Sequence, residues 1–245
     1  MSMSRDYGRH YARFHPDTPE HDAHLRTLLQ RWLGPHLPAD RAADILDVGC
    51  GRGYALSLLR EQGYSRLSGI DPDTGQVEFA QQRGLPVTLV SDTVAHLRAS
   101  GAGRDLILLM DVLEHIPVAE QVEFLQAVTG SLRPGGRLIC TVPNAASPLG
   151  IYWRYADYTH RTAFSTHSLI HALRLGGLEV DQLESVEFIA RPRFLFWLPT
   201  RRAARWWLLC LSRFFHRAVC LAELGWDQGW NTPLGPNLLA VGRRK

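Results

Sequence analysis

The chain has 245 residues, 45% of them apolar, and a net charge of +3, as expected for a globular protein with a substantial core. So small a charge does not by itself indicate nucleic-acid binding. Four widely spaced cysteines, Cys50, Cys140, Cys210 and Cys220, form no C-x-x-C pair, so we expect a reducing cytoplasm and neither a zinc cage nor a disulfide framework. The sequence shows no signal-peptide core and no apolar run of the ~20 residues that span a bilayer, so neither secretion nor a transmembrane helix is expected.

An N-terminal helix is predicted over residues 20–34, where leucines and a tryptophan recur at helical spacing before Pro35. We expect this helix to form part of a cap, residues 1–40, that precedes the main domain, residues 41–245.

Short apolar runs alternate with amphipathic stretches after residue 43, which is typical of parallel βαβ units and an α/β, doubly wound sheet. Strands are predicted at 44–49, 66–71, 86–90, 105–110 and 136–143, with helices at 53–62, 73–83, 93–100 and 119–132. A further helix is expected at 167–177, and residues 235–245 are predicted as a final edge strand.

Ligands of doubly wound sheets bind outside the carboxyl ends of the strands, and the unusual residues of this chain follow those ends. They are Asp47 and three glycines after the first strand, Asp71 after the second, Ser91 and Asp92 after the third, Met110 and Asp111 after the fourth, and Asn144 after the fifth. One ligand is therefore expected to contact all of them.

Gly49, Gly51 and Gly53 can adopt positive φ and expose backbone N–H groups to a ligand. The dinucleotide pattern G-x-G-x-x-G is not met, because Tyr54 takes the place of its third glycine, and no Gly-Lys-Ser/Thr of a P-loop follows. Phosphate binding is therefore disfavoured.

Asp47, at the end of the first strand, would repel a pyrophosphate but can anchor an ammonium group. Asp71, at the end of the second strand, is placed to accept hydrogen bonds from both ribose hydroxyls. Together the two carboxylates indicate a nucleoside that carries an amino acid.

As a set, these stretches resemble the motifs of class I S-adenosylmethionine-dependent methyltransferases: "DILDVGCGRG", "GIDPD", "SDTV", "LILLMDVLEHI" and "LRPGGRLICTVPN". The resemblance implies a Rossmann-like seven-stranded sheet of order 3-2-1-4-5-7-6, with S-adenosylmethionine as the methyl donor and S-adenosylhomocysteine as the product. The cofactor-binding residues it implies are Asp47, Gly49, Cys50, Gly51 and Gly53 for the methionine part, Asp71 and Pro72 for the ribose, Ser91, Asp92 and Thr93 for the adenine, and Met110 and Asp111 beside the adenine or sulfonium. Taken alone, Asp73 and Asp92 also suit helix N-caps.

The stretch "DVLEHI" resembles quinone-biosynthesis O-methyltransferases, in which this arrangement has been linked with a metal. We predict no metal here; if one is bound, the resemblance implies Asp111, Glu114 and His115 as its ligands. Two alternatives remain: Glu114 and His115 hydrogen-bond a loop, or His115 faces the substrate as a catalytic residue.

Residues 152–169 resemble a segment of methyltransferases encoded with bacterial polysaccharide and O-antigen assembly enzymes. His160 is the predicted general base and Asp157 its partner, unless His160 only fastens the loop to the sheet. Residues 143–166 are the predicted substrate loop, with Asn144, Tyr152, Trp153, Tyr155 and Tyr158 as substrate-binding residues; stacking on sugars or an aromatic acceptor would explain so many rings.

Between residues 191 and 217 there are seven arginines, no acidic residue and several aromatic rings. A basic aromatic helix can lie in a membrane interface, so residues 191–230 are predicted to be a helical insertion that contacts anionic lipid through 191–221. Packing over the active site or in a homodimer interface is the alternative.

The function expected from these patterns is S-adenosylmethionine-dependent O-methylation of a glycan or lipid-linked glycan, in the cytoplasm or on the inner face of its membrane. The alternatives are a quinone or other small aromatic acceptor, a non-catalytic cofactor-binding module, and an NAD-dependent dehydrogenase if the glycine pattern is misread. No base-reading module points to nucleic acid.

Overall fold

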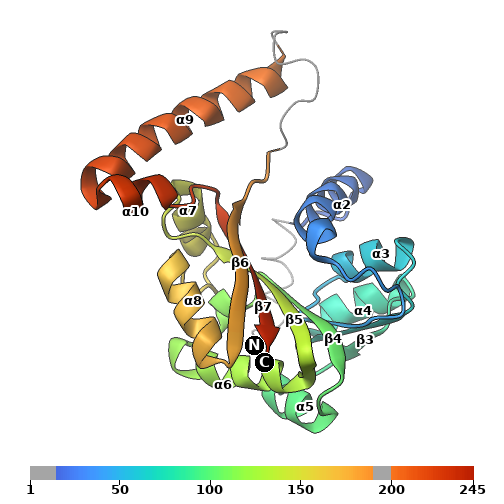
Figure 1. The fold of residues 1–245 in the computed structure, drawn as a ribbon. Helices are drawn as coiled ribbons and strands as arrows, with labels where there is room; N and C mark the ends of the chain where they lie inside the picture. Colours follow the sequence, from blue (N-terminus) through green and yellow to red (C-terminus); the bar gives the residue numbers. More distant parts are fainter. Residues whose placement is uncertain (1–14, 190–199) are drawn as a thin grey trace.

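A computed structural model of the protein describes residues 15–189 and 200–245, except for the side chain of residue 202. It contains a seven-stranded sheet with helices on both faces (Figure 1). In chain order the strands are β1 (Asp44–Val48), β2 (Arg66–Asp71), β3 (Val87–Leu89), β4 (Arg104–Met110), β5 (Leu132–Pro143), β6 (Leu178–Val186) and β7 (Asn237–Arg244). Their order in the sheet is β3-β2-β1-β4-β5-β7-β6, so the predicted doubly wound fold is confirmed.

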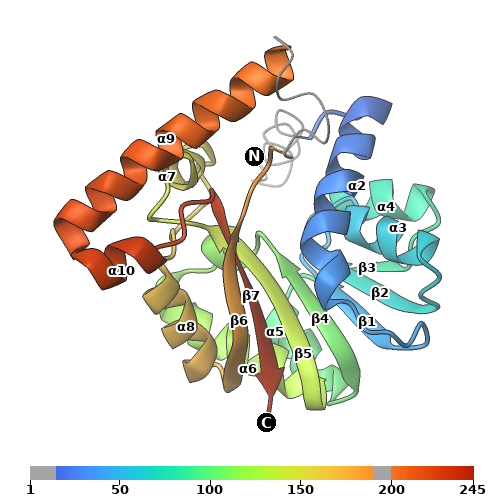
Figure 2. The same ribbon diagram turned by 45° about the horizontal axis from the view of Figure 1, so that its top comes forward.

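The helices divide between two hydrophobic layers, one on each face of the sheet (Figure 2). One layer contains α2 (Pro19–Leu33) and α3 (Tyr54–Glu61), and the other contains α5 (Thr93–Ser100), α6 (Val118–Ser131) and α8 (Thr166–Leu175). The remaining helical elements are α4 (Thr74–Gln82), α7 (Pro148–Ala156), α9 (Arg201–Leu224), α10 (Trp226–Asn231) and the short 3-10 turns η1 (Gly34–His36) and η2 (Leu113–His115).

The last strand, β7, lies inside the sheet and not at its edge. It pairs antiparallel with β5 from Arg243 to Asn237 and with β6 on its other side, so the expectation of a final edge strand was wrong. The side-chain pattern gives the reason: β7 is a continuous apolar run, as suits a strand buried on both faces. In contrast, β6 alternates apolar residues with Glu179, Asp181 and Glu184, as edge strands commonly do.

The four parallel pairings bring the carboxyl ends of β1 to β5 to one side of the sheet. Two helices that begin there are capped by aspartates: Asp73 accepts a hydrogen bond from the Gln76 N–H, and Asp92 from the Ala95 N–H. These caps explain why α4 and α5 begin one residue after each aspartate.

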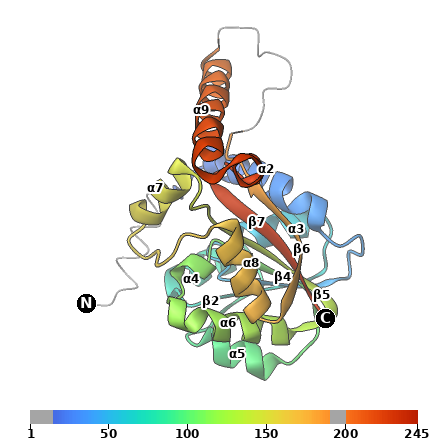
Figure 3. The ribbon, with the colours of Figure 1, turned by 60° about the vertical axis from the view of Figure 1, so that its left-hand side comes forward.

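After β6 the chain forms a helical arm, α9 followed by α10, which stands away from the sheet (Figure 3). Within 15–189 and 200–245, none of the helices combines the length and the apolar character needed to cross a bilayer. The predicted insertion begins at residue 191, and its first nine residues lie outside the described part of the chain.

Candidate active site

The glycine turn after β1 depends on backbone shapes that other residues rarely adopt. Gly49, Gly51 and Gly53 all have positive φ. A Cβ at Gly49 would lie 2.5 Å from Val112, and one at Gly53 would lie 2.5 Å from Leu85. The turn is therefore shaped to bring backbone N–H groups close to a ligand while it packs against its neighbours.

Asp71 connects the end of β2 to this turn. Its Oδ2 accepts a hydrogen bond from the Gly51 N–H at 2.8 Å, and its Oδ1 accepts one from the Asp73 N–H at 2.8 Å. Burial raises the pKa of Asp71, although these two bonds oppose the rise. Because each carboxylate oxygen has two acceptor sites, Asp71 keeps capacity for the ribose hydroxyls expected from the sequence.

Asp47, the next-to-last residue of β1, is 2% exposed. Burial, followed by the charge of the nearby Asp71, raises the pKa of Asp47 to about 8. Within the described residues no ion pair is recorded for Asp47. A buried carboxylate with a raised pKa and no recorded ion pair suits a ligand that carries a positive charge. Asp47 therefore fits the ammonium group of S-adenosylmethionine.

The other residues predicted for the cofactor surround the turn in different ways. The side chain of Cys50 packs in a small core cluster with Leu56 and Val77, which leaves only its backbone to face a ligand. Asp92 is exposed and caps α5 through Oδ1, while Met110 at the end of β4 packs against the core. Pro72 and Ser91 are exposed, and Thr93 is the first residue of α5.

Asp111 has a strained backbone, with φ of 54°, directly after β4. Its N–H donates to Thr141 Oγ1 at 3.0 Å, and its Oδ1 accepts hydrogen bonds from the Thr141 hydroxyl at 3.0 Å and the Asn237 amide at 2.8 Å. Two neighbouring strands, β5 and β7, thus hold this residue while it stays exposed on the cofactor side.

The N-terminal cap covers the glycine turn from outside. The rings of His15 and His21 lie 6.3 and 6.2 Å from that of Tyr54, and Arg52 donates a hydrogen bond to the His15 carbonyl at 3.0 Å. Burial lowers the pKa of His15 to about 4. The sequence reading missed this contact because His15 and Arg52 are far apart along the chain.

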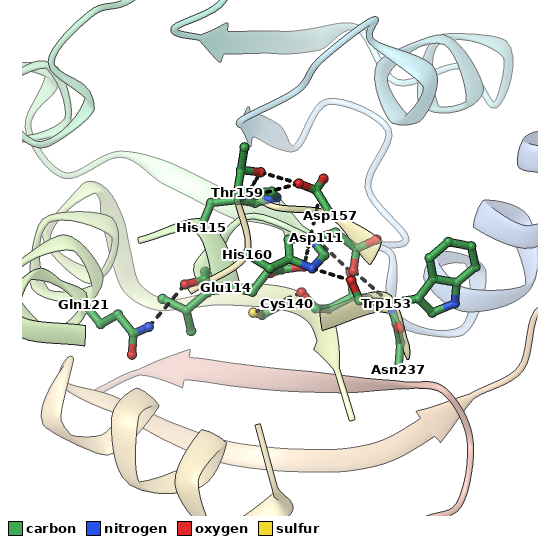
Figure 4. Close-up of polar contacts among 12 residues, drawn as sticks. Asp111, Glu114, His115, Gln121, Cys140, Trp153, Asp157, Thr159, His160 and Asn237 are labelled. Carbon is green, nitrogen blue, oxygen red and sulfur yellow. Dashed lines mark hydrogen bonds and ion pairs between the residues drawn. The ribbon is translucent and has the colours of Figure 1, made fainter. Parts of the chain in front are cut away.

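The predicted substrate loop folds back onto η2 and brings two histidines together (Figure 4). The N–H groups of Arg161 and Thr162 donate to the Glu114 carbonyl at 2.6 and 3.2 Å. As a result the rings of His115 and His160 pack edge to face, with centroids 4.6 Å apart.

Hydrogen bonds determine which nitrogen of each histidine carries the proton. His160 Nδ1 lies 3.0 Å from the Trp153 carbonyl, which can only accept, so this nitrogen donates. The Thr159 hydroxyl donates to Asp157 at 2.6 Å, so it accepts from His115 Nδ1 at 2.9 Å. Both neutral imidazoles therefore carry the lone pair on Nε2.

The predicted pair of Asp157 and His160 is present but loose. His160 Nε2 lies 3.9 Å from Asp157 Oδ2 and also 3.9 Å from Glu114 Oε1. Burial would raise the pKa of Asp157. Hydrogen bonds from Thr159, together with the electrostatic effect of His160 and His115, outweigh burial and lower the pKa. The carboxylate is thus ionised near a base that can gain a proton.

Glu114 is fully buried, and both of its side-chain oxygens lack a hydrogen-bond partner within the described residues. Burial raises its pKa well above the usual value, and Asp111 and Asp157 add to the rise. Burial also lowers the pKa of His115 to about 4. Buried acids of this kind usually have a partner, so Glu114 indicates a cation or proton that the protein residues do not supply.

The ligand set of a metal differs from the one suggested by the sequence. Glu114, His115 and His160 each offer a ligand atom, all within 4.8 Å of one another. Asp111, the third ligand expected from the sequence, is instead held by Thr141 and Asn237. His160 joins this candidate set in place of Asp111 because the loop returns to η2. No local sequence pattern predicts that return.

Asn144, predicted to bind substrate, is a structural residue. It is fully buried; its amide donates to the carbonyls of Pro233 and Gly235 at 2.8 and 2.7 Å, and its Oδ1 accepts from the Ala146 N–H. The prediction was wrong because these partners come from the segment before β7, far away in sequence.

The predicted aromatic residues separate into two groups. Tyr152, Tyr155 and Tyr158 are exposed, Tyr158 at 94%, on α7 and the turn after it. Trp153 packs edge-on toward Phe188 and holds His160 through its carbonyl. Thr159, within the predicted loop, was overlooked, although its hydroxyl connects Asp157 to His115.

Comparison with known proteins places this site in a family. A family model described as a methyltransferase domain matches residues 20–183, which is more than half of the chain. A ubiquinone biosynthesis O-methyltransferase of Methylocella silvestris is 32% identical over 145 residues, covering 54% of this chain and 56% of that protein. Another, from a Methylobacterium species, is 31% identical over 116 residues, covering 46% and 45%. The chain spans about half the length of the curated relatives it matches.

The fold has close counterparts among solved structures. A SAM-dependent methyltransferase from Archaeoglobus fulgidus superposes with a TM-score of 0.64 at 18% identity, covering 89% of this chain and 94% of that one. At such low identity the likeness concerns the fold alone.

The sheet order, the glycine turn and the carboxylates at the strand ends define a class I, Rossmann-like methyltransferase fold. With the family match added, the chain belongs to the S-adenosylmethionine-dependent methyltransferases, and S-adenosylmethionine is the cofactor that this family implies.

Asp47→Asn is expected to weaken S-adenosylhomocysteine binding about 10- to 100-fold, the loss typical of one charged hydrogen bond. In the wild type, affinity should increase as pH rises toward about 8, because Asp47 must lose its proton to bind an ammonium group. Calorimetry at several pH values measures both effects. Asp227→Asn on α10 is the control, and an unchanged pH profile in the Asp47 variant would contradict the assignment.

Asn144→Ala is expected to lower the free energy of unfolding by about 2–4 kcal/mol, because three buried hydrogen bonds are lost. Urea denaturation measures the change. Asn231→Ala, at an exposed position, is the control and should lower the free energy of unfolding by no more than about 0.5 kcal/mol. Equal losses in the two variants would show that the buried hydrogen bonds of Asn144 contribute no more to stability than an exposed one.

Proposed function

We propose that this methyltransferase transfers its methyl group to a hydroxyl oxygen of an acceptor that binds beside His160. The observation that carries the proposal is the fixed tautomer of His160: Nδ1 donates to the Trp153 carbonyl, so in the neutral ring Nε2 carries the lone pair that can accept a proton. A hydroxyl needs such a base because it must lose its proton during transfer.

We assign the cofactor-binding roles as the resemblance implies them, and the positive φ values of the glycine turn support this assignment. Asp47 would take the ammonium group, the glycine backbone the rest of the methionine part, and Asp71 the ribose, while Asp92 and Met110 lie on the adenine side. When bound, S-adenosylmethionine supplies an electrophilic methyl group on a sulfonium. The task left to the protein is to hold the acceptor oxygen in line with that methyl group.

In this proposal the acceptor hydroxyl passes its proton to His160 Nε2 as its oxygen forms the new bond to carbon. The imidazolium then lies 3.9 Å from Oδ2 of Asp157, whose ionised carboxylate favours its positive charge. Asp157 also fixes His115 through Thr159, so the two histidines keep their relative positions.

A sugar hydroxyl of a glycan or lipid-linked glycan is the proposed acceptor. Its support is that Tyr152, Tyr155 and Tyr158, in the same predicted loop as His160, are all exposed, because exposed aromatic rings suit a large polar molecule that is only partly enclosed. Small aromatic ligands instead favour enclosed apolar pockets.

A metal-dependent methylation of a phenolic acceptor is the second candidate. Glu114, His115 and His160 form a set of two nitrogens and one oxygen that suits a divalent transition metal. Each histidine already donates its other N–H to a protein acceptor, as metal-bound histidines usually do. A bound metal would lower the pKa of a phenol and orient its oxygen.

His160→Gln is expected to lower the methylation rate about 10²- to 10⁴-fold, which is the usual contribution of a general base. The rate is measured as S-adenosylhomocysteine formation with acceptors that range from sugars and lipid-linked glycans to catechols. S-adenosylhomocysteine affinity should not change. His171→Gln, an exposed histidine of α8, is the control.

Full activity in the His160 variant would mean that this residue only fastens the loop. Cofactor binding without methylation of any acceptor would support a non-catalytic module. Preference for catechols over sugars would support the second candidate.

Under the second candidate, Mn²⁺ or Zn²⁺ should raise the melting temperature of chelator-treated protein, because binding to the folded state stabilises it. Glu114→Gln should remove this increase. Without metal the same variant should be more stable than the wild type near neutral pH, because a raised pKa in the folded state makes the glutamate lose stability as pH rises. A metal-induced shift that survives in Glu114→Gln would contradict the site.

A further inference from the structure

The arm formed by α9 and α10 carries an apolar stripe on its outer side. Leu208, Leu211, Phe214, Phe215 and Val219 recur at intervals of three or four residues, so they share one face of α9. Each is more than half exposed. A helix that packs on its own domain normally turns such a face inward.

The opposite side of α9 faces the protein. Arg213 pairs with Glu187 at 3.1 Å, and Arg217 bonds to the Gly229 carbonyl and lies over the Trp230 ring. Cys220 on the same side is buried. These contacts occupy the inner side of α9. The apolar stripe lies on the opposite side of the helix, away from the rest of the described chain.

The charges beside the stripe are divided between its two ends. Arg201 and Arg205 are exposed at the start of α9, and Glu223 is exposed at its end. Eighteen residues separate Arg205 from Glu223, which is about five helical turns, so both lie along the same margin of the stripe. No ion pair is recorded for these three residues within the described ranges.

We propose that the stripe packs against the same stripe of a second copy of this chain, with the two α9 helices antiparallel. In a two-fold pair, each margin of one helix meets the same margin of the other. An axis at the middle of the stripe, between residues 213 and 214, sets Glu223 of the partner subunit beside Arg205. The apolar stripes are buried, and opposite charges meet at both ends.

Charge placement favours this partner over a lipid surface. A helix that lies on an anionic membrane carries basic residues along its polar face, where they meet the headgroups. Here Arg213 and Arg217 bind the protein itself, and an acid stands at the end of the stripe. Two of the arginines on which the expected membrane contact depended therefore do not face the headgroups.

Sedimentation equilibrium of the full chain tests the proposal, with a concentration-dependent dimer as the expected result. Leu211→Ser/Phe214→Ser should give a monomer. Glu223→Arg should raise the dimer dissociation constant about tenfold, as should Arg201→Glu/Arg205→Glu, through lost attraction and added repulsion. Combining both sets of changes should restore the wild-type constant, because the charges are exchanged.

Arg174→Glu, a charge reversal on exposed α8, is the control for net charge and should leave the dimer unchanged. A monomer at all concentrations would overturn the proposal, and so would a dimer that tolerates Leu211→Ser/Phe214→Ser. A dimer that dissociates with the serine variant but ignores the charge exchange would overturn the antiparallel arrangement. Binding of monomers to phosphatidylglycerol vesicles through the same stripe would show that lipid is the partner instead.

Discussion

Acidic groups buried at the carboxyl ends of parallel strands are the feature on which the site depends. Asp47 at the end of β1 and Glu114 after β4 are both withdrawn from water, and burial raises the pKa of each. Such groups cost free energy unless a ligand, proton or cation meets them. The sheet therefore holds two positions that favour positive charge, one on the cofactor side and one beside the histidine pair.

The strands hold these positions through contacts between elements that are distant in sequence. Asp71 connects β2 to the glycine turn, while Thr141 and Asn237 hold Asp111 from β5 and β7. The substrate loop reaches the site because its backbone bonds to the Glu114 carbonyl. The proposed cofactor site and the proposed acceptor site thus lie along one edge of the sheet, and residues of several strands and loops hold them.

The helical arm differs from the other helices in the side chains that it exposes. Its arginines at 213 and 217 face inward and its apolar stripe faces outward, whereas α6 and α8 bury their apolar faces against the sheet. The family match ends at residue 183, before the arm begins. The arm therefore lies outside the residues on which the family assignment rests.

The sequence by itself determined the layers of the fold, the glycine turn and the carboxylates that follow the strands, because these depend on local periodicity and on what parallel strands place at one edge. It also predicted His160 with Asp157 as one candidate site and His115 in another, and the structure brings the two histidines together. Only the tertiary structure decided that Asn144 is held by the segment before β7, that His160 lies beside Glu114 and His115, and that Arg213 and Arg217 face the protein. Each of these depends on contacts between segments far apart in the chain, which hydrophobic periodicity and residue spacing do not encode.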